Sequence, residues 1–226
     1  MSRILVTGAD GWLGSYLVPE LELLGDEVVG VDRGDGDLAA PSVAAALMRE
    51  HQPDVVVHMA SAVGRERCDD DVRGTIEDSV LATTLVAQAA AEYDARLVYF
   101  STSEVYGDMR GAWSDEEGPF GTRHNLYALV KWWGEEVCRL YAPKGLTVIR
   151  PTMPYGPGMP FDGHGRAAVM MILRDALEGR PITVHRGARR SWCYVTDITR
   201  MLGAVIHHGL TGTWNVGRDD DDTSML

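Results

Sequence analysis

Tyr127 and Lys131 are a pair whose residue types and spacing could do chemistry, because residues four apart on a helix lie on one face. A free phenol has a pKa of about 10 and is a poor base at neutral pH. A nearby ammonium stabilises the phenolate and lowers that pKa. The phenol could then move a proton to or from a hydroxyl or a ketone. The pair alone is a weak signal, since Tyr and Lys often occur at this spacing by chance.

Hydroxyl and acidic residues after a predicted strand strengthen the catalytic interpretation of this pair. Leu97–Ser101 is predicted to be a buried strand, and Thr102, Ser103 and Glu104 follow it directly. In an open α/β sheet, ligands bind at the carboxyl ends of the strands. Thr102 or Ser103 could therefore hydrogen-bond the reacting oxygen and hold it against Tyr127.

The N-terminus carries a glycine-rich turn, Gly8-x-x-Gly11-x-x-Gly14, between a predicted strand and a predicted helix. Gly8 allows the tight turn, Gly11 lets the backbone approach a pyrophosphate, and Gly14 allows the helix to pack closely on the strand. The helix N-terminus then presents free N–H groups to phosphates. Glycine triplets also occur in ordinary turns, but the strand, the helix and a later acidic residue together indicate a dinucleotide site.

That acidic residue is Asp32, at the end of the second predicted strand. A carboxylate there accepts hydrogen bonds from the adenosine ribose and repels a 2′-phosphate, which favours NAD over NADP. Arg33 weakens this preference because an arginine can hold a 2′-phosphate. NAD is the expected cofactor, and NADP is the alternative.

Strands alternate with amphipathic helices over the first 150 residues, which predicts an α/β fold with a doubly wound parallel sheet. The expected strands are Arg3–Thr7, Glu27–Asp32, Asp54–Met59, Leu97–Ser101 and Leu146–Arg150. The expected helices are Gly14–Leu24, Ser42–Glu50, Thr75–Glu92 and Leu126–Tyr141. Strands this apolar are typical of a sheet covered by helices on both faces.

The pattern changes after Arg150, where a Pro- and Gly-rich connection over residues 151–160 cannot be regular helix. Later elements are expected to be helices at Ala167–Glu178 and within Val195–His207, and strands at Ile182–His185 and Thr213–Val216. We therefore expect a Rossmann dinucleotide-binding domain, residues 1–150, and a small substrate lobe, residues 151–226, interwoven with the end of the sheet.

The composition excludes several classes of protein. A formal net charge of −12 argues against a nucleic-acid partner, which needs a basic face. The three cysteines are far apart and the adjacent histidines have no third ligand nearby, so we expect neither disulfides nor a metal. The apolar run Ile4–Val6 is far too short for a signal sequence or a membrane span, and we expect a cytoplasmic protein without a membrane partner.

Taken together, these blocks resemble the extended short-chain dehydrogenase/reductases, specifically the NAD-dependent epimerase/dehydratase family. The resemblance covers essentially the whole chain, in this order: Thr7-Gly8-x-x-Gly11-x-x-Gly14, Asp32, Asp37-Leu38, the segment 53–60, the segment 101–107, Tyr127-x-x-x-Lys131, Arg150-Pro151-x-x-x-Tyr155-Gly156-Pro157-Gly158, the segment 190–197 and Asn215-Val216-Gly217. Most members of this family act on nucleotide-linked sugars through a transient 4-keto intermediate.

The resemblance implies a role for each matching residue. Tyr127 would be the acid/base, Lys131 would bind the nicotinamide ribose and tune Tyr127, and Thr102 would be their hydroxyl partner, with Ser103 and Glu104 beside it. The cofactor would lie along Gly8, Gly11, Trp12, Leu13, Gly14, Asp32, Arg33, Asp37, Leu38, Met59, Ala60, Ser61, Tyr127 and Lys131. The substrate would lie near Arg190, Tyr155 and Met153.

Glu104 sits where the 4,6-dehydratases and some decarboxylases of the family carry a catalytic acid. It could remove the C5 proton that a 4-ketone makes acidic, although the dehydratases often have Asp where this chain has Ser103. The leading hypothesis is NAD-dependent epimerisation or dehydration of a nucleotide sugar. The short stretch from Asp32 to Asp37 resembles the dTDP-4-dehydrorhamnose reductases, so an NAD(P)H-dependent 4-ketosugar reductase is the alternative. A non-catalytic dinucleotide-sensing protein is a third hypothesis, because fold alone does not establish catalysis.

This chain also departs from the family pattern in places. Met153 stands where nucleotide-sugar enzymes usually have Asn, and Met cannot donate to a pyrophosphate. Ser79 replaces an Asn on the long helix, and relatives usually continue beyond Gly217, so we expect an incomplete C-terminal lobe. Trp132 and Trp133 cannot both face the site. In this family the helices that carry such residues form an isologous contact, so we expect a homodimer.

Overall fold

Six strands form the central sheet of the computed structural model, which describes residues 1–108, 116–118, 120–142, 145–160, 168–182, 189–217 and 223–224. The strands are β1 (Arg3–Thr7), β2 (Glu27–Val31), β3 (Val55–His58), β4 (Arg96–Phe100), β5 (Thr147–Pro151) and β9 (Gly212–Val216). They pair in parallel in the order β2-β1-β3-β4-β5-β9. The predicted doubly wound parallel sheet is therefore confirmed.

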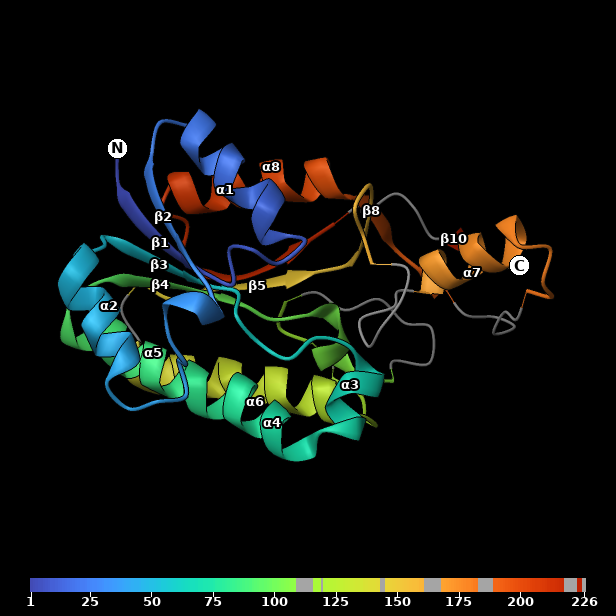
Figure 1. Cartoon of the computed structure of the whole chain (residues 1–226), viewed down its shortest axis with the longest axis horizontal. Coiled ribbons are helices and arrows are strands. Elements are labelled where there is room, and N and C mark those ends of the chain that lie inside the picture. Colours follow the sequence, from blue (N-terminus) through green and yellow to red (C-terminus); the bar gives the residue numbers. More distant parts are fainter. Residues whose placement is uncertain are drawn as a thin grey trace.

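Helices cover both faces of this sheet (Figure 1). The helices on one face are α1 (Gly14–Leu23) and α8 (Val195–His207), and those on the other are α2 (Val43–His51), α5 (Ala82–Glu92) and α6 (Leu126–Tyr141). Because side chains alternate along a strand, β1 sends Ile4 and Val6 into the core under α1 and α8 and Leu5 into the core under α2 and α5. The central strands β1, β3, β4 and β5 are thus buried on both sides, as their apolar sequences require, whereas the edge strands β2 and β9 are partly exposed.

The strand order reverses at β1, because the chain passes from β1 to β2 on one side and then to β3 on the other. Open α/β sheets bind ligands in the crevice at the carboxyl ends of the strands beside such a reversal. The glycine-rich turn follows β1 at this edge, and Thr102 and Glu104 follow β4 at the same edge. The topology therefore brings the predicted dinucleotide turn and the predicted catalytic segment to one end of the sheet.

The helix expected at Thr75–Glu92 has a more complex form. The structure has α4 (Val72–Ile76), a π-helical turn η2 (Glu77–Leu81) and then α5. The predicted long helix is confirmed, since these three elements follow one another without a break, but the π turn inserts a wider repeat that apolar periodicity does not show. Turns of this kind are frequent at functional sites, and η2 carries Ser79, which reaches the loop after β3.

Short elements that the sequence pattern did not predict lie around the same edge. They are η1 (Arg33–Asp35), α3 (Arg65–Asp70), η3 (Ser103–Tyr106), β6 (Met153–Tyr155) and β8 (Trp192–Tyr194). β6 lies in the Pro- and Gly-rich connection and pairs with β8 in parallel. Elements of two to six residues are too short for a hydrophobic period to be read.

The C-terminal third leaves the sheet and returns to it. Beyond the sheet edge lie α7 (Ala168–Leu177) and the strand pair β7 (Arg189–Arg190) and β10 (Thr223–Ser224), while α8 and β9 pack back on the sheet (Figure 1). The expected strand Ile182–His185 falls mostly outside the described residues. None of the helices in the described ranges combines the length and apolarity that a bilayer crossing needs.

Candidate active site

The turn after β1 is built so that only glycine fits at two of its positions. Gly8 has a φ of +74°, and a Cβ there would lie 2.8 Å from the backbone nitrogen of Ala60. A Cβ at Gly14 would lie 2.5 Å from the carbonyl oxygen of Gly8. Leu13 occupies the N-cap of α1 and makes no side-chain capping bond. The Ser15 and Tyr16 N–H groups donate to the carbonyls of Gly11 and Leu13, so in the described contacts it is the Leu13 and Gly14 N–H groups that remain available to an anion such as a dinucleotide pyrophosphate.

Asp32 is held beside this turn by two backbone groups. Its Oδ2 accepts from the Asp10 N–H at 3.1 Å and its Oδ1 accepts from the Arg33 N–H at 2.8 Å. The Arg33 side chain points elsewhere, into an ion pair with Asp78 of η2, which Arg67 also approaches at 3.4 Å. The carboxylate is thus placed as an adenosine ribose requires, and the guanidinium that a 2′-phosphate would need already has a partner.

Asp37, Leu38 and Met59, which were predicted to border the cofactor, also stabilise the fold. Asp37 Oδ1 accepts from the Ala39 N–H at 2.9 Å, which fixes the turn after η1. Leu38 is partly buried against the core under α2 and α5, and Met59 against the core under α1 and α8. Asp37, Leu38 and Met59 all follow strands of the sheet at its carboxyl edge.

The loop after β3 packs directly on the loop around the glycine turn. The Ala60 N–H donates to Thr7 Oγ1 at 3.3 Å. Ser61 Oγ lies 3.0 Å from Ser79 Oγ, and the Ala62 N–H donates to the same Ser79 oxygen at 3.2 Å. Ser79, which replaces the family's usual Asn, therefore holds this loop in place against the π turn.

His58 is a buried residue of this region whose hydrogen bonds define its tautomer. Thr83 donates to the Ser79 carbonyl at 2.7 Å, so its oxygen must accept from His58 Nε2 at 3.1 Å. His58 Nδ1 then accepts from the Thr7 hydroxyl at 2.8 Å. Burial lowers the pKa of His58 to about 3, assisted by a nearby ammonium. The imidazole is neutral, and one directed chain of hydrogen bonds joins β1, β3 and η2.

The predicted acid/base residue lies beside the predicted hydroxyl partner. Tyr127 is partly buried in the first turn of α6, and the Thr102 side chain is near enough to its phenol to influence the phenol's pKa. Burial raises the pKa of Tyr127 to about 12, the Thr102 bond opposes this, and the charge of Glu104 adds to it. Ser103 begins η3 next to Thr102. Of the two hydroxyl candidates, Thr102 is the one whose hydroxyl opposes the rise in the pKa of Tyr127.

Lys131 lies one turn further along α6 and is only 3% exposed. Its Nζ donates to the Phe100 carbonyl at 2.7 Å, and burial lowers its pKa to about 8. The lowering of the Tyr127 pKa by Lys131 together with a nicotinamide ring stays a prediction, since in the chain by itself that pKa is raised. The physical reason is that burial of the phenol outweighs the surrounding charges, while the ammonium is directed to the end of β4.

Glu104 has two partners that the sequence analysis missed. Its Oε2 accepts from Arg65 Nε at 2.9 Å, from Arg65 Nη2 at 2.6 Å and from Asn125 Nδ2 at 3.2 Å. Asn125 also caps α6, because its Oδ1 accepts from the Ala128 N–H at 2.8 Å. An Asn directly before the predicted helix was a readable capping signal, whereas Arg65 lies in a helix of six residues with no periodic pattern.

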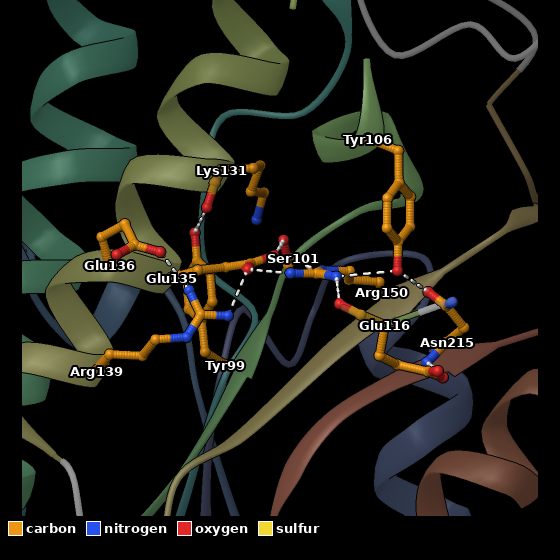
Figure 2. A network of polar contacts seen from close by, with 10 residues as sticks. All are labelled: Tyr99, Ser101, Tyr106, Glu116, Lys131, Glu135, Glu136, Arg139, Arg150 and Asn215. Atoms are coloured by element: carbon orange, nitrogen blue, oxygen red, sulfur yellow. Dashed lines mark hydrogen bonds and ion pairs between the residues drawn. The ribbon is translucent and has the colours of Figure 1, made fainter. Parts of the chain in front are cut away.

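The middle of α6 is anchored to the sheet by the network in Figure 2. Arg150 of β5 and Glu135 of α6 form two parallel bonds, Nε to Oε1 at 2.9 Å and Nη2 to Oε2 at 2.7 Å, and Ser101 donates to Oε1 at 2.5 Å. Burial alone would raise the pKa of Glu135, but the bonds from Arg150 and Ser101 outweigh it and hold that pKa below its usual value. Glu135 is thus a carboxylate fixed one turn from Lys131.

The other arm of the network reaches the neighbouring strand. Arg150 Nη1 donates to the Tyr106 hydroxyl and to the Glu116 carbonyl, both at 2.9 Å. Tyr106 donates to Asn215 Oδ1 at 2.7 Å, and the Asn215 N–H donates to Glu116 Oε1 at 2.9 Å. One buried guanidinium therefore fixes the segment after β4, helix α6 and strand β9 around β5 (Figure 2).

The predicted substrate residues lie across from the glycine turn. Trp12 Nε1 and the Tyr16 hydroxyl both donate to the Pro157 carbonyl, at 2.8 and 3.0 Å. The Met153 N–H in β6 donates to the Ser191 carbonyl, and the Tyr155 ring meets the Tyr194 ring edge to face. The backbone of Arg190 lies in β7, and its side chain is outside the described residues.

Known proteins share this fold over most of the chain. A UDP-N-acetyl-alpha-D-glucosaminuronate decarboxylase of Bacillus cytotoxicus is 29% identical over 97% of the chain and 76% of its own length. The structure of the UDP-glucose 4-epimerase of Thermus thermophilus in complex with NAD matches with a TM-score of 0.84 at 25% identity, over 96% of this chain and 78% of that one. A dTDP-4-dehydrorhamnose reductase of Bacillus anthracis in complex with NADP matches with a TM-score of 0.81 at 26% identity, over 96% and 74%.

The family model described as NAD dependent epimerase/dehydratase matches residues 4–217, nearly the whole chain. The matched span includes the glycine turn, Asp32 and the catalytic segment whose geometry is described above. This agrees with the family that the sequence motifs implied. The chain belongs to the NAD dependent epimerase/dehydratase family and is an NAD-dependent oxidoreductase-type enzyme.

Proposed function

We propose that this enzyme epimerises or dehydrates a nucleotide-linked sugar through a 4-keto intermediate, with Tyr127 as the acid/base. One observation carries the proposal. Thr102, Glu104 and Tyr127 come together at the carboxyl end of β4, on the same sheet edge as the glycine turn and Asp32. A hydroxyl, a carboxylate and a phenol at one end of the sheet are the groups that proton transfer at adjacent sugar carbons needs.

The residues around the glycine turn fit a dinucleotide. The turn leaves no room for a Cβ at Gly8 or Gly14, the N-terminus of α1 lacks a capping side chain, and Asp32 is held beside both. These groups would hold the pyrophosphate and the adenosine ribose. NAD, when bound, supplies the hydride acceptor. The Asp32 carboxylate favours NAD over NADP, because it would repel a 2′-phosphate at this position.

Tyr127 would exchange a proton with the sugar hydroxyl at C4 through its phenol oxygen. With a pKa of about 12 the phenol is protonated at neutral pH in the chain by itself. A positive charge nearby stabilises the phenolate, so the catalytic base forms only where the bound cofactor brings that charge. Thr102 orients the phenol by its hydrogen bond, and Lys131 holds the carbonyl of Phe100 beneath the site.

Glu104 would act at the neighbouring carbon, C5. Its carboxylate lies near enough to Tyr127 for its charge to raise the pKa of that phenol. Arg65 and Asn125 fix its Oε2, so its orientation is set before any substrate arrives. A carboxylate held in this way can remove the C5 proton once C4 is a ketone, which is the step that distinguishes dehydration from simple epimerisation.

Substituting Tyr127 by Phe tests the catalytic assignment. We expect Tyr127→Phe to reduce turnover of dTDP-glucose or UDP-glucose by about 10²–10⁴-fold, since general acid/base groups contribute that much, while NAD affinity stays within about two-fold. Tyr141→Phe, at the exposed end of the same helix, is the matched control and should change neither. Turnover that survives Tyr127→Phe would refute the assignment.

A 4-ketosugar reductase is a second candidate, favoured by the short connection after β2. In the described residues β2 is the edge strand, and only η1 and a turn separate it from Asp37. The B. anthracis reductase with NADP shares the fold at a TM-score of 0.81. Cofactor balance decides between the two, because a reductase consumes reduced cofactor in proportion to product, whereas an epimerase or dehydratase regenerates its NAD.

The expected homodimer belongs to the same proposal, together with a cytoplasmic location and the division of the chain at residue 150. Helix α6 exposes large apolar side chains at Leu129, Trp132, Trp133 and Leu140. An exposed apolar surface of this kind marks a protein contact, and two copies related by a twofold axis would cover it isologously. Sedimentation of the intact protein as a monomer would contradict this.

A further inference from the structure

We infer that Asn125 is a positioning residue that holds the first turn of α6 and the Glu104 carboxylate in one arrangement, so that Glu104 accepts the C5 proton through Oε1. The inference rests on the proposed function and adds a residue to the same site. Asn125 lies directly before α6, and the Tyr127-x-x-x-Lys131 motif of the family begins two residues later. The sequence motifs therefore assign Asn125 no role.

The side-chain amide of Asn125 makes two hydrogen bonds in a fixed orientation. Its Oδ1 accepts from the Ala128 N–H at 2.8 Å, while its backbone carbonyl accepts from the Leu129 N–H at 3.3 Å. A backbone N–H can only donate, so the amide oxygen must face the helix and the amide nitrogen must face away from it. Asn125 Nδ2 donates to Glu104 Oε2 at 3.2 Å. The helix cap thus ensures that a donor faces the carboxylate.

One side chain therefore orients both groups that would act on the sugar. Asn125 is the N-cap of α6, and a capping side chain fixes the first turn of a helix, which here carries Tyr127. The same side chain binds Glu104, which lies 21 positions earlier in the chain. In the proposed function Tyr127 acts at C4 and Glu104 at C5. Groups that act on adjacent carbons need a fixed position relative to each other, and Asn125 supplies it.

Arg65, the other partner of Glu104, is less suited to fix an orientation. The Arg65 side chain is 56% exposed, and water competes for an ion pair of this kind. Asn125 is partly buried, and the cap already immobilises its amide. Binding Glu104 costs Asn125 little further side-chain entropy, whereas a long arginine side chain loses more. Arg65 thus supplies charge, and Asn125 supplies direction.

The hydrogen bonds also distinguish the two oxygens of Glu104. Arg65 Nε, Arg65 Nη2 and Asn125 Nδ2 all donate to Oε2, whereas Oε1 receives none of the described hydrogen bonds. The lone pairs of Oε2 are engaged, so Oε1 is the oxygen free to bind a proton. In the proposed step the C5–H bond breaks, its electron pair passes into the enolate of the C4 ketone, and Oε1 gains the proton.

The test measures C5 proton removal and C4 oxidation separately, on the full chain with saturating NAD. The probes are dTDP-glucose and UDP-glucose. C4 oxidation is followed by the absorbance of reduced cofactor after mixing, and C5 proton removal by deuterium uptake from heavy water into the sugar, measured by mass spectrometry. A role in folding alone would slow both steps together, whereas a role in positioning Glu104 slows the second step more.

Two substitutions keep a capping oxygen and remove the amide donor. Asn125→Ser should slow deuterium uptake at least about ten-fold, as loss of a hydrogen bond to a charged group does, and leave C4 oxidation within about three-fold. Asn125→Asp should in addition move the acid limb of the pH profile for deuterium uptake upward by about one unit, because neighbouring carboxylates repel each other. Asp71→Ser changes the N-cap of α4 in the same way and should alter neither step.

The outcomes separate this inference from the proposed function. If Asn125→Ser slows both steps equally, or slows neither, the positioning role is refuted while the proposed chemistry stands. If the wild-type protein oxidises C4 but takes up no deuterium, the C5 role of Glu104 and this inference are refuted while Tyr127 keeps its role at C4. If neither probe reacts with the wild-type protein, the proposed function fails and the inference fails with it. Thermal melting of each variant verifies that folded proteins are compared.

Discussion

Two Arg–Glu ion pairs lie beside α6, one at the middle of the helix and one near its N-terminus, and they differ chiefly in burial. The side chains of Arg150 on β5 and Glu135 in the middle of α6 are 2% and 0% exposed, whereas those of Arg65 on α3 and Glu104 on η3 are 56% and 23% exposed. Both pairs use two nitrogens of the guanidinium. Removing one partner of a buried pair leaves a charge without compensation, but an exposed pair exchanges its partner for water at little cost. The same chemistry thus fixes the fold in one place and forms an exposed, exchangeable contact in the other.

The largest expected effect comes from breaking the buried pair. Arg150→Met leaves Glu135 buried without its main partner and also deprives Tyr106 of a donor. We expect the free energy of unfolding in urea to fall by about 3–5 kcal/mol. Arg139→Met is the control, since Arg139 binds the same carboxylate from a more exposed position and should cost under about 1 kcal/mol. Equal effects of the two substitutions would show that burial does not distinguish these contacts.

The pH dependence of stability tests whether the buried His58 side chain is neutral in the folded protein. The pKa of His58 lies at about 3 in the folded protein, against an ordinary value of 6.5 for a free histidine side chain. The unfolded chain therefore binds more protons below pH 6.5, and stability is lost as pH falls through this range. We expect a loss of about 2 kcal/mol between pH 7 and pH 5. His58→Gln should flatten this part of the profile, whereas His51→Gln, at the surface end of α2, should reproduce the wild-type slope.

Substitution of Gly134 tests packing on α6 without changing any charge. A Cβ there would lie 2.1 Å from the hydroxyl oxygen of Tyr99, which is itself buried. Alanine normally stabilises a helix interior by about 1 kcal/mol over glycine, but the overpacking should outweigh this and give a net loss on the order of 1 kcal/mol. The measurement is the sign of the change in the free energy of unfolding, obtained from a urea titration. A more stable Gly134→Ala protein would mean that α6 can shift away from β4.

The smallest effect on stability is expected at the exposed pair. Arg65→Met should change the free energy of unfolding by less than about 1 kcal/mol, because both partners can turn to water. The measurement is the same urea titration as for Arg150→Met, under the same buffer. A loss comparable to that of Arg150→Met would place Arg65 among the residues that hold the fold, and would remove the contrast between the two ion pairs.

The sequence predicted the sheet well because its signals are local. Apolar runs bounded by Gly and Asp gave β1 with its observed bounds, and the amphipathic period gave α6 with its observed bounds as well. The glycine spacing located the turn whose geometry now excludes a Cβ at Gly8 and Gly14. These features depend on backbone geometry over a few residues, which is what sequence patterns encode.

The partners of the site residues could not be predicted in the same way. Arg65 meets Glu104 across 39 positions and Arg33 meets Asp78 across 45, and no period or motif links such residues. The raised pKa of Tyr127 was missed for a related reason, since burial decides it and burial is a tertiary property. The π turn at η2 escaped because one wider repeat within an apolar helix leaves the hydrophobic pattern unchanged.

The carbonyl of Pro157 receives hydrogen bonds from both Trp12 and Tyr16, so the turn that would hold the dinucleotide and the connection that leads to the substrate side share one acceptor. A shift of either segment must therefore strain or break these two hydrogen bonds and so affect the other segment. Occupancy on one side would then change affinity on the other, and thermodynamic linkage requires the two changes to be equal in size. Measuring the affinity for NAD with and without the sugar nucleotide, and the reverse, would give that coupling as a single number.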